Sequence, residues 1–154
     1  MKKLLRSLFW LLALNTAAWL GGRYLGKRMS SGDASSDEFT LATFYGGDTF
    51  SSNATALRSG RVRLIMGGLM LDLRDATLDS SGAHLTVETT MGGAMIRVSE
   101  EWRVMVEEEL TAAEVQVDVT SPDALPADAP QLHIRVIGRA AGITITSAPG
   151  KTFD

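Results

Sequence analysis

The chain has 154 residues, enough for one domain and an appendage, and its lack of cysteine excludes disulfides and cysteine-ligated zinc. Its formal charge of −3 hides an asymmetry, because residues 1–28 hold six basic and no acidic residues, whereas residues 29–154 hold nine basic and all 18 acidic ones. The second part, at a formal −9, would repel phosphate backbones, so we expect no nucleic-acid partner.

The N-terminal segment from Leu4 to Leu25 is mostly apolar and predicts a membrane-spanning helix. About 20 helical residues cross a hydrocarbon core of about 30 Å, and Arg6 and Arg23 lie near the ends, where cationic side chains reach the headgroups. We therefore expect residues 1–28 to form a single-pass anchor with basic flanks, in contact with the lipid bilayer through residues 4–25. Its principal apolar side chains are Leu8, Phe9, Trp10, Leu11, Leu12, Leu14, Trp19 and Leu20.

A cleaved secretory signal is the alternative, because it too begins with basic residues before a short apolar core. Cleavage would leave a secreted domain. The small-x-small cleavage pattern is poor, since Trp19-Leu20 follows Ala17-Ala18, and the basic residues after the core are typical of a stop-transfer flank. We therefore favour the anchor. Three basic residues flank each side of the core, so the positive-inside rule does not decide on which side of the membrane the domain lies.

The remaining chain divides by composition. Residues 29–38 are small and polar and predict a flexible linker. Residues 39–146 carry the apolar alternation of a β domain, and residues 147–154 predict a frayed tail. Three prolines within Ser121–Pro130 predict a protruding loop.

Three segments of the β domain share one pattern, an apolar run followed by Gly-Gly and a second apolar run. A recurrence every 20–25 residues or so is typical of a solenoid. Ala112-Ala113 and Ala140-Ala141-Gly142 look like two degenerate copies. Small residues fit sharp bends where neighbouring backbones come close. The glycine pairs, predicted as repeat turns, are Gly46 and Gly47, Gly67 and Gly68, and Gly92 and Gly93.

Alternation with a period of two predicts short, half-buried strands around these turns. Val62 and Leu64, then Leu69, Leu71 and Leu73, are examples of the apolar positions. We expect a short right-handed β-solenoid, a β-helix-like stack of about five coils. An antiparallel β-sandwich with Gly-Gly in hairpin turns is the alternative, which the spacing of turns does not reject.

Two segments resemble the C-terminal domain of the cell-wall-active antibiotic response (LiaF-like) family. The first is Leu71–Ala76, preceded by Ile65–Gly68, and the second is Met91–Val104, with its Gly-Gly, strand and Trp-x-Val order. The resemblance covers roughly Phe39 to Val119. It departs from the family pattern in having one membrane helix where the family has several, and Ser99 where the family often has proline.

The resemblance implies a compact β-helix-like stack and a non-enzymatic role. The family's role is membrane-linked regulation of an envelope-stress signalling system through contact with a sensor kinase. We therefore expect a regulator or interaction module that acts by protein–protein contact with a membrane protein partner. A bactofilin-like scaffold that self-assembles through its solenoid ends is the alternative, with Ile143–Thr146 as a terminal segment apolar enough to pair.

Patterns of catalytic and cofactor chemistry are missing from the sequence. No Gly-x-Ser-x-Gly occurs, and no Gly-Gly pair is followed by Gly-Lys-Ser/Thr. We expect no enzymatic activity, no cofactor and no metal. His84 and His133 sit at outward strand positions, where they could bind a metal with Glu88 or, more simply, face solvent.

Candidate interaction residues fall into three groups, each with a structural alternative. Asp72, Arg74 and Asp75 could form a docking patch or a turn held by aspartate side chains. Trp102 could anchor an interface or cap the inside of a coil. The acidic run of Glu107, Glu108 and Glu109 could steer a basic partner or be a solvated face.

Overall fold

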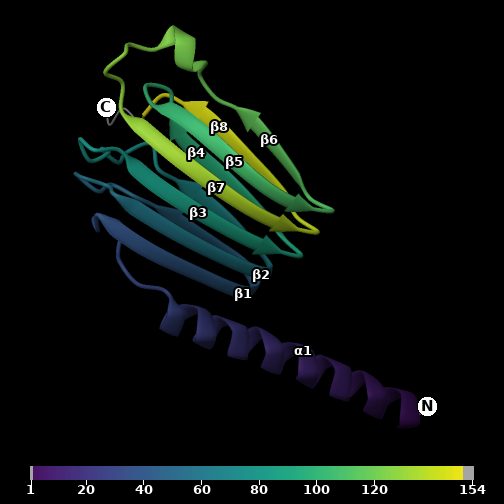
Figure 1. Ribbon diagram of the computed structural model, residues 1–154. Helices are drawn as coiled ribbons and strands as arrows, with labels where there is room; N and C mark the ends of the chain where they lie inside the picture. The colour runs from purple at the N-terminus through teal and green to yellow at the C-terminus, as the bar shows by residue number, and fades with distance from the viewer. Residues whose placement is uncertain (1, 151–154) are drawn as a thin grey trace.

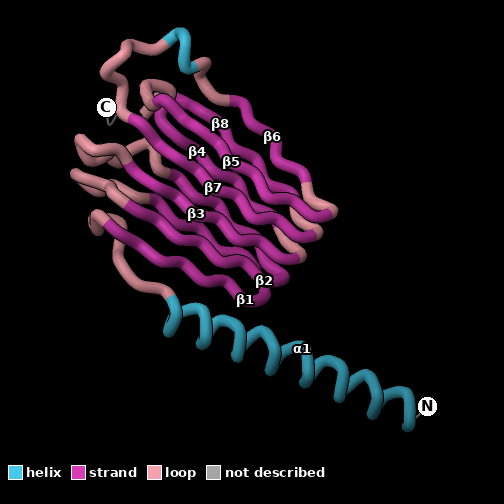
Figure 2. Tube along the Cα trace, in the orientation of Figure 1, coloured by secondary structure: helices cyan, strands magenta, loops and turns pink. Residues whose placement is uncertain are grey.

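The computed structural model describes residues 2–150, in which one N-terminal helix is followed by a parallel sheet that nearly closes on itself (Figures 1 and 2). This arrangement is consistent with a short solenoid, so the predicted mostly-β class with one N-terminal helix is confirmed. Residues 151–154 of the predicted tail lie outside the described residues. The elements are α1 (Lys2–Met29), β1 (Glu38–Ser51), β2 (Ser59–Asp72), β3 (Ala83–Thr90), β4 (Gly93–Ser99), β5 (Arg103–Thr111), β6 (Glu114–Asp118), the 3₁₀ turn η1 (Pro122–Ala124), β7 (Gln131–Arg139) and β8 (Gly142–Ala148).

The strands form two rows that share the long strands β1 and β2. In the first row, the N-terminal halves of β1 and β2 are followed by β3, β7 and β5. In the second row, the C-terminal halves of β1 and β2 are followed by β4, β8 and β6. Within residues 2–150, every pairing between two named strands is parallel, so the antiparallel sandwich considered above is wrong.

The order of strands in space differs from their order in the chain. After β6, the loop that contains η1 carries the chain back, and β7 and β8 insert between the β3–β4 pair and the β5–β6 pair (Figure 1). β8 therefore has a neighbour on each side, β4 and β6. The expectation that Ile143–Thr146 would offer a free pairing edge is wrong, because β5 and β6 end the two rows instead.

Successive passes of the chain bend at one aligned position. We call this row of bends, together with the small residues after them, the Gly-Gly corner. Gly68, Gly93 and Gly142 lie opposite one another in the parallel register, so the degenerate copy Ala140-Ala141-Gly142 aligns with the true Gly-Gly repeats. The residue that takes the left-handed conformation precedes the small pair. These positive-φ residues are Tyr45 (83°), Met66 (53°), Met91 (54°), Ala112 (49°) and Ala140 (48°).

Glycine is needed at the corner chiefly for close backbone approach. A Cβ atom added to Gly67 would lie 2.7 Å from the carbonyl oxygen of Gly46, and one added to Gly92 would clash with the carbonyl oxygen of Gly67. Gly47 and Gly142, the second residues of their pairs, face open space. Gly67 and Gly92 thus fit the backbone of the preceding pass, whereas Gly46, on the first pass, takes a positive φ of 121° beside the Trp19 ring.

The core lies between the two rows. Alternate side chains point inward and stack on their counterparts in the neighbouring strands, as the period-two pattern predicts. Burying each such aliphatic side chain contributes about 1.5–3 kcal/mol. The largest fully buried side chains are Val62, Leu64, Leu71, Leu73, Val87, Ile96, Val98, Leu132, Ile134, Val136, Ile143 and Ile145.

Candidate functional site

Helix α1 packs its C-terminal half along the free edge of β1 (Figure 1). Gly22 and Gly26, one helical turn apart, are buried on the face that meets the strand. A Cβ atom on Gly26 would lie 2.5 Å from the carbonyl oxygen of Ala42, and one on Gly22 would clash with that of Phe44. The two glycines let the helix backbone approach the edge carbonyls of β1 closely, which covers this end of the stack.

Polar contacts hold the helix and the following segment to β1. The hydroxyl of Tyr45 donates to Asn15 Oδ1 at 2.8 Å, and the amide of Ala42 donates to Ser30 Oγ at 3.0 Å. Ser31 and Thr40 exchange a pair of backbone hydrogen bonds, each 2.8 Å long. The segment 29–38, expected to be a flexible linker, is therefore hydrogen-bonded to β1 in this structure.

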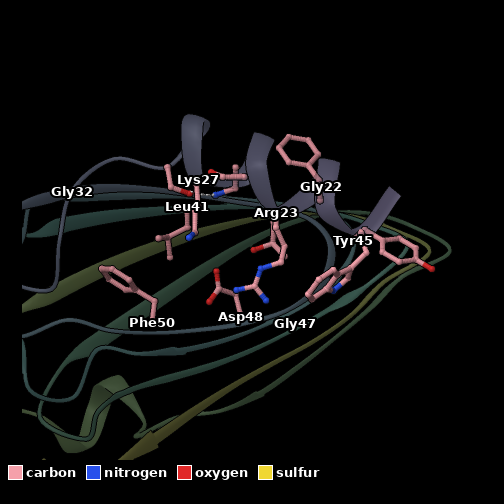
Figure 3. A pocket seen from close by; sticks show the side chains of 16 residues that line it. Gly22, Arg23, Lys27, Gly32, Leu41, Tyr45, Gly47, Asp48 and Phe50 are labelled. Carbon is pink, nitrogen blue, oxygen red and sulfur yellow. Dashed lines mark hydrogen bonds between the residues drawn. The ribbon is translucent and has the colours of Figure 1, made fainter. Parts of the chain in front are cut away.

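A groove of about 380 Å³ lies between α1 and β1 (Figure 3). Arg23 on the helix and Asp48 on the strand point toward one another within it. The guanidinium of Arg23 lies over the ring of Trp19, 5.2 Å from its centroid, and that of Arg28 lies 4.9 Å from the centroid of Tyr24. Cation–π pairs between arginine and aromatic residues suit the headgroup region of a membrane.

The N-terminal half of α1 projects past the sheet and exposes its apolar side chains (Figure 1). Leu4, Phe9 and Leu14, for example, are 77%, 69% and 67% exposed. By length and composition, the helix is long and apolar enough to cross a membrane, a property that a signal sequence shares. The coarse prediction of a membrane-compatible N-terminal helix is confirmed.

Asp72 and Arg74 form a buried ion pair rather than an open docking patch. Arg74 Nη2 lies 2.7 Å from Asp72 Oδ2, Arg74 Nε donates to Asp72 Oδ1 at 2.9 Å, and their side chains are only 15% and 8% exposed. The Asp72 carboxylate raises the pKa of the Arg74 guanidinium through these hydrogen bonds. Arg74 Nη1 also donates to the carbonyl oxygen of Pro149, so the pair ties the end of β2 to the segment after β8. This geometry favours the structural alternative.

Trp102 and the acidic run differ in their exposure. Trp102 is 4% exposed and belongs to the core, which favours its structural alternative as well. Glu107, Glu108 and Glu109 are exposed on β5, which ends the first row. Glu109 Oε2 lies 3.5 Å from Arg135 Nη2 on β7. The acidic run therefore borders the open end of the stack.

Inward-facing residues of β5 and β6 are less covered than those of the inner strands. Val117, for example, is 41% exposed, whereas Ile145, its partner on β8, is fully buried. No strand among the described residues lies beyond β5 and β6 to cover them. We call this surface, at the outer edges of β5 and β6, the open end. Its inward-facing residues are Val106, Glu108, Val115 and Val117, and its outward-facing border is formed by Met105, Glu107 and Glu109. It combines apolar side chains with a border of negative charge.

His84 and His133 are brought together by the register of β3 and β7. Their rings stack with centroids 5.0 Å apart. Glu88, the carboxylate that could have joined them, lies four residues from His84 along the same strand and pairs with Arg63 at 3.0 Å. Among the described residues, no three side chains of the usual ligand types are grouped to hold a metal ion.

The contact of α1 with β1 is the feature that sequence reasoning missed. Gly22, Gly26 and Ser30 recur at intervals of four, which places small residues on one helical face. This interval of four indicates close packing of the helix against another element. The apolar pattern of the same segment is stronger, and it predicts only a membrane-spanning helix. Comparisons with protein-family models, with curated proteins and with solved structures found no match.

Proposed function

We propose that this chain is a non-enzymatic, membrane-anchored interaction module that acts by contact with a membrane protein partner. The packing of an exposed apolar helix on the edge strand of the sheet carries the proposal. Because α1 is held to β1 by Gly22, Gly26, Asn15 and Ser30, the anchor also sets the orientation of the domain. Retention at one membrane raises the effective concentration of the domain for partners there.

The open end is the surface that fits such a partner best. The opposite end of the stack is covered by α1, whereas β5 leaves inward-facing Val106 half-buried and β6 leaves inward-facing Val117 41% exposed. Glu107, Glu108 and Glu109 border these apolar side chains with negative charge. A partner with a basic rim around a small apolar patch would be complementary to it in charge and in polarity.

The resemblance to the LiaF-like family supports the biological setting. It points to an envelope-stress response and to a sensor kinase as the kind of partner. The aligned corner residues and the two rows of parallel strands support the finer fold proposal, a right-handed solenoid of about five coils. In that solenoid, the last pass of the chain occupies the penultimate position of the stack.

Self-assembly as a bactofilin-like scaffold is the second candidate, and the structure offers it less support. End-to-end stacking needs two free ends, but α1 covers β1 at one of them. At the other, the acidic run would face a like copy with like charge, which is a common means of preventing edge pairing.

Capture of the partner from detergent extracts tests the proposed function. The bait is the full chain with a photo-reactive residue at Met105, compared with a triple variant Glu107→Lys, Glu108→Lys and Glu109→Lys. Glu38→Lys, an exposed change on β1 at the other end of the stack, is the control. We expect a membrane sensor protein to crosslink to the native chain and the control, and much less to the triple variant. Recovery of no membrane sensor or envelope-stress component would contradict the proposal.

A further inference from the structure

The Gly-Gly corner differs in charge from the rest of the acidic domain. Its bends contain one acidic residue, Glu114, and one basic residue, Arg139. At the other ends of the strands, residues 72–79, 100–101 and 118–128 hold three, two and three acidic residues. These bends are residues 45–47, 65–68, 90–93, 111–114 and 139–142.

Large apolar side chains are exposed at the part of the corner nearest α1. Met66 and Met91 are 50% and 58% exposed, and Ile65 beside them is 38% exposed. Tyr45 continues the same row on β1, since Gly46 lies opposite Gly67. With adjacent strands about 4.8 Å apart, these residues form a short apolar edge next to the helix.

The projecting half of α1 points in the same direction as this edge (Figure 1). A Cβ atom on Gly46 would lie 3.7 Å from Trp19 Nε1, and one on Gly22 would lie 3.4 Å from Tyr45 Cβ, so the corner is level with Trp19 and Gly22, and the Tyr45 hydroxyl reaches on to Asn15. The 16 helical residues from Lys3 to Ala18 beyond that level reach about 24 Å, which is less than the hydrocarbon thickness of about 30 Å. If the helix stays packed on β1 and its apolar residues lie in the bilayer, the surface of the bilayer therefore reaches the corner.

Aromatic and cationic residues on α1 also place the membrane surface near the corner. Trp19 with Arg23, and Tyr24 with Arg28, form the cation–π pairs described above, just on the domain side of Asn15. Tryptophan and tyrosine concentrate at the level of the headgroups. With Trp19 at that level, Tyr45 and its neighbours in the row lie at the membrane surface.

We infer that the Gly-Gly corner rests on the lipid bilayer, with Tyr45, Met66 and Met91 inserted among the headgroups and upper acyl chains. This inference rests on the membrane anchorage proposed above. The acidic run of β5 lies on the outermost strand of the first row, so the contact is centred on β1, β2 and β3 rather than on the whole corner. The arrangement turns the acidic strand ends away from the membrane and leaves the open end free for a partner.

Single cysteines test this contact cleanly, because the chain has none of its own. The full chain is reconstituted in vesicles, and Met66→Cys, Met91→Cys, Ser80→Cys and Leu11→Cys variants are each labelled with an environment-sensitive fluorophore. Ser80 is exposed and precedes β3 at the end opposite Met91, so it is the matched control. Leu11 reports insertion of the helix. Quenching by lipids with a spin label on the upper acyl chain is then measured.

We expect labels at Met66 and Met91 to be quenched several-fold more than a label at Ser80. Quenching at Leu11 together with Ser80-like values at both methionines would overturn the inference and leave the anchorage standing. No quenching at Leu11 would overturn the anchorage and the inference with it. A third outcome is that labels at the methionines are not quenched by lipid and become shielded from solvent only when a membrane protein is added. That outcome would assign the edge to a protein partner and also overturn the inference.

Discussion

At the scale of single residues, the glycines of the Gly-Gly corner differ in how well they would accommodate a Cβ atom. A methyl group on Gly92 would clash with the carbonyl oxygen of Gly67, whereas one on Gly47 would meet nothing within 4 Å. We expect Gly92→Ala to lower the free energy of unfolding by about 3 kcal/mol, because backbone must move to admit the Cβ atom. Gly47→Ala should change it by less than about 0.5 kcal/mol. Denaturant unfolding of the full chain in detergent measures both, and equal losses would contradict this account.

The pair of Asp72 and Arg74 gives a second prediction at this scale. Asp72→Asn leaves the guanidinium in a largely buried place without its carboxylate, so we expect a loss of about 3 kcal/mol in unfolding free energy. The double variant Asp72→Asn with Arg74→Gln removes both charges and should recover much of the loss. The same denaturant measurement checks it. A double variant as unstable as the single one would show that the ion pair is not the cause.

Sequence reasoning located most inward-facing residues, but it could not identify the conformation at the bends. The alternation of Leu69, Leu71 and Leu73 matches their burial at 5%, 0% and 1%. Met66 continues the alternation of Val62 and Leu64 yet is half exposed, because a positive φ angle there turns its side chain out of the strand pattern. A preference for glycine at positive φ would have assigned the bend to the glycine that follows.

At the scale of elements, the docking of α1 on β1 depends on two glycines, Gly22 and Gly26, whose lack of a side chain allows close approach. We expect Gly22→Leu with Gly26→Leu to detach the helix, because a larger side chain at either position meets the carbonyl oxygens of β1. Amide hydrogen exchange of the peptide 39–46 should then rise, since the amide of Ala42 loses Ser30 and the edge of β1 becomes open. Gly21→Leu, at a helical position with nothing within 4 Å, is the matched control and should leave exchange unchanged. Equal exchange in all three proteins would contradict the docking.

The order of strands could not be predicted, although the strands themselves could. Local alternation of apolar and polar residues predicts each strand. Which strands become neighbours in a parallel stack depends instead on long-range packing. The loop of residues 121–130 is long enough to carry the chain to either side of β5, and nothing in its composition selects one side. Insertion of β7 gives Leu132, Ile134 and Val136 neighbours on both sides, and all three are at most 1% exposed. The less apolar residues of β6 are left at the open end.

At the scale of the whole molecule, the chain is polarised along two directions. Along the strands, an apolar corner lies opposite acidic turns, and across the stack, a helix-covered end lies opposite the open end. The basic N-terminal segment and the acidic domain were apparent from composition. Their relative orientation was not, because it depends on the close contact of Gly22 and Gly26 with β1.

Retention of α1 in the mature, membrane-bound protein is the central claim of this account. The direct measurement is the intact mass of the protein after alkaline extraction of cell membranes, with the pellet and the supernatant compared. We predict a chain that keeps its N-terminal helix, with a mass of about 16.5 kDa, in the membrane pellet. A shorter chain that has lost the helix and is found in the supernatant would contradict the claim.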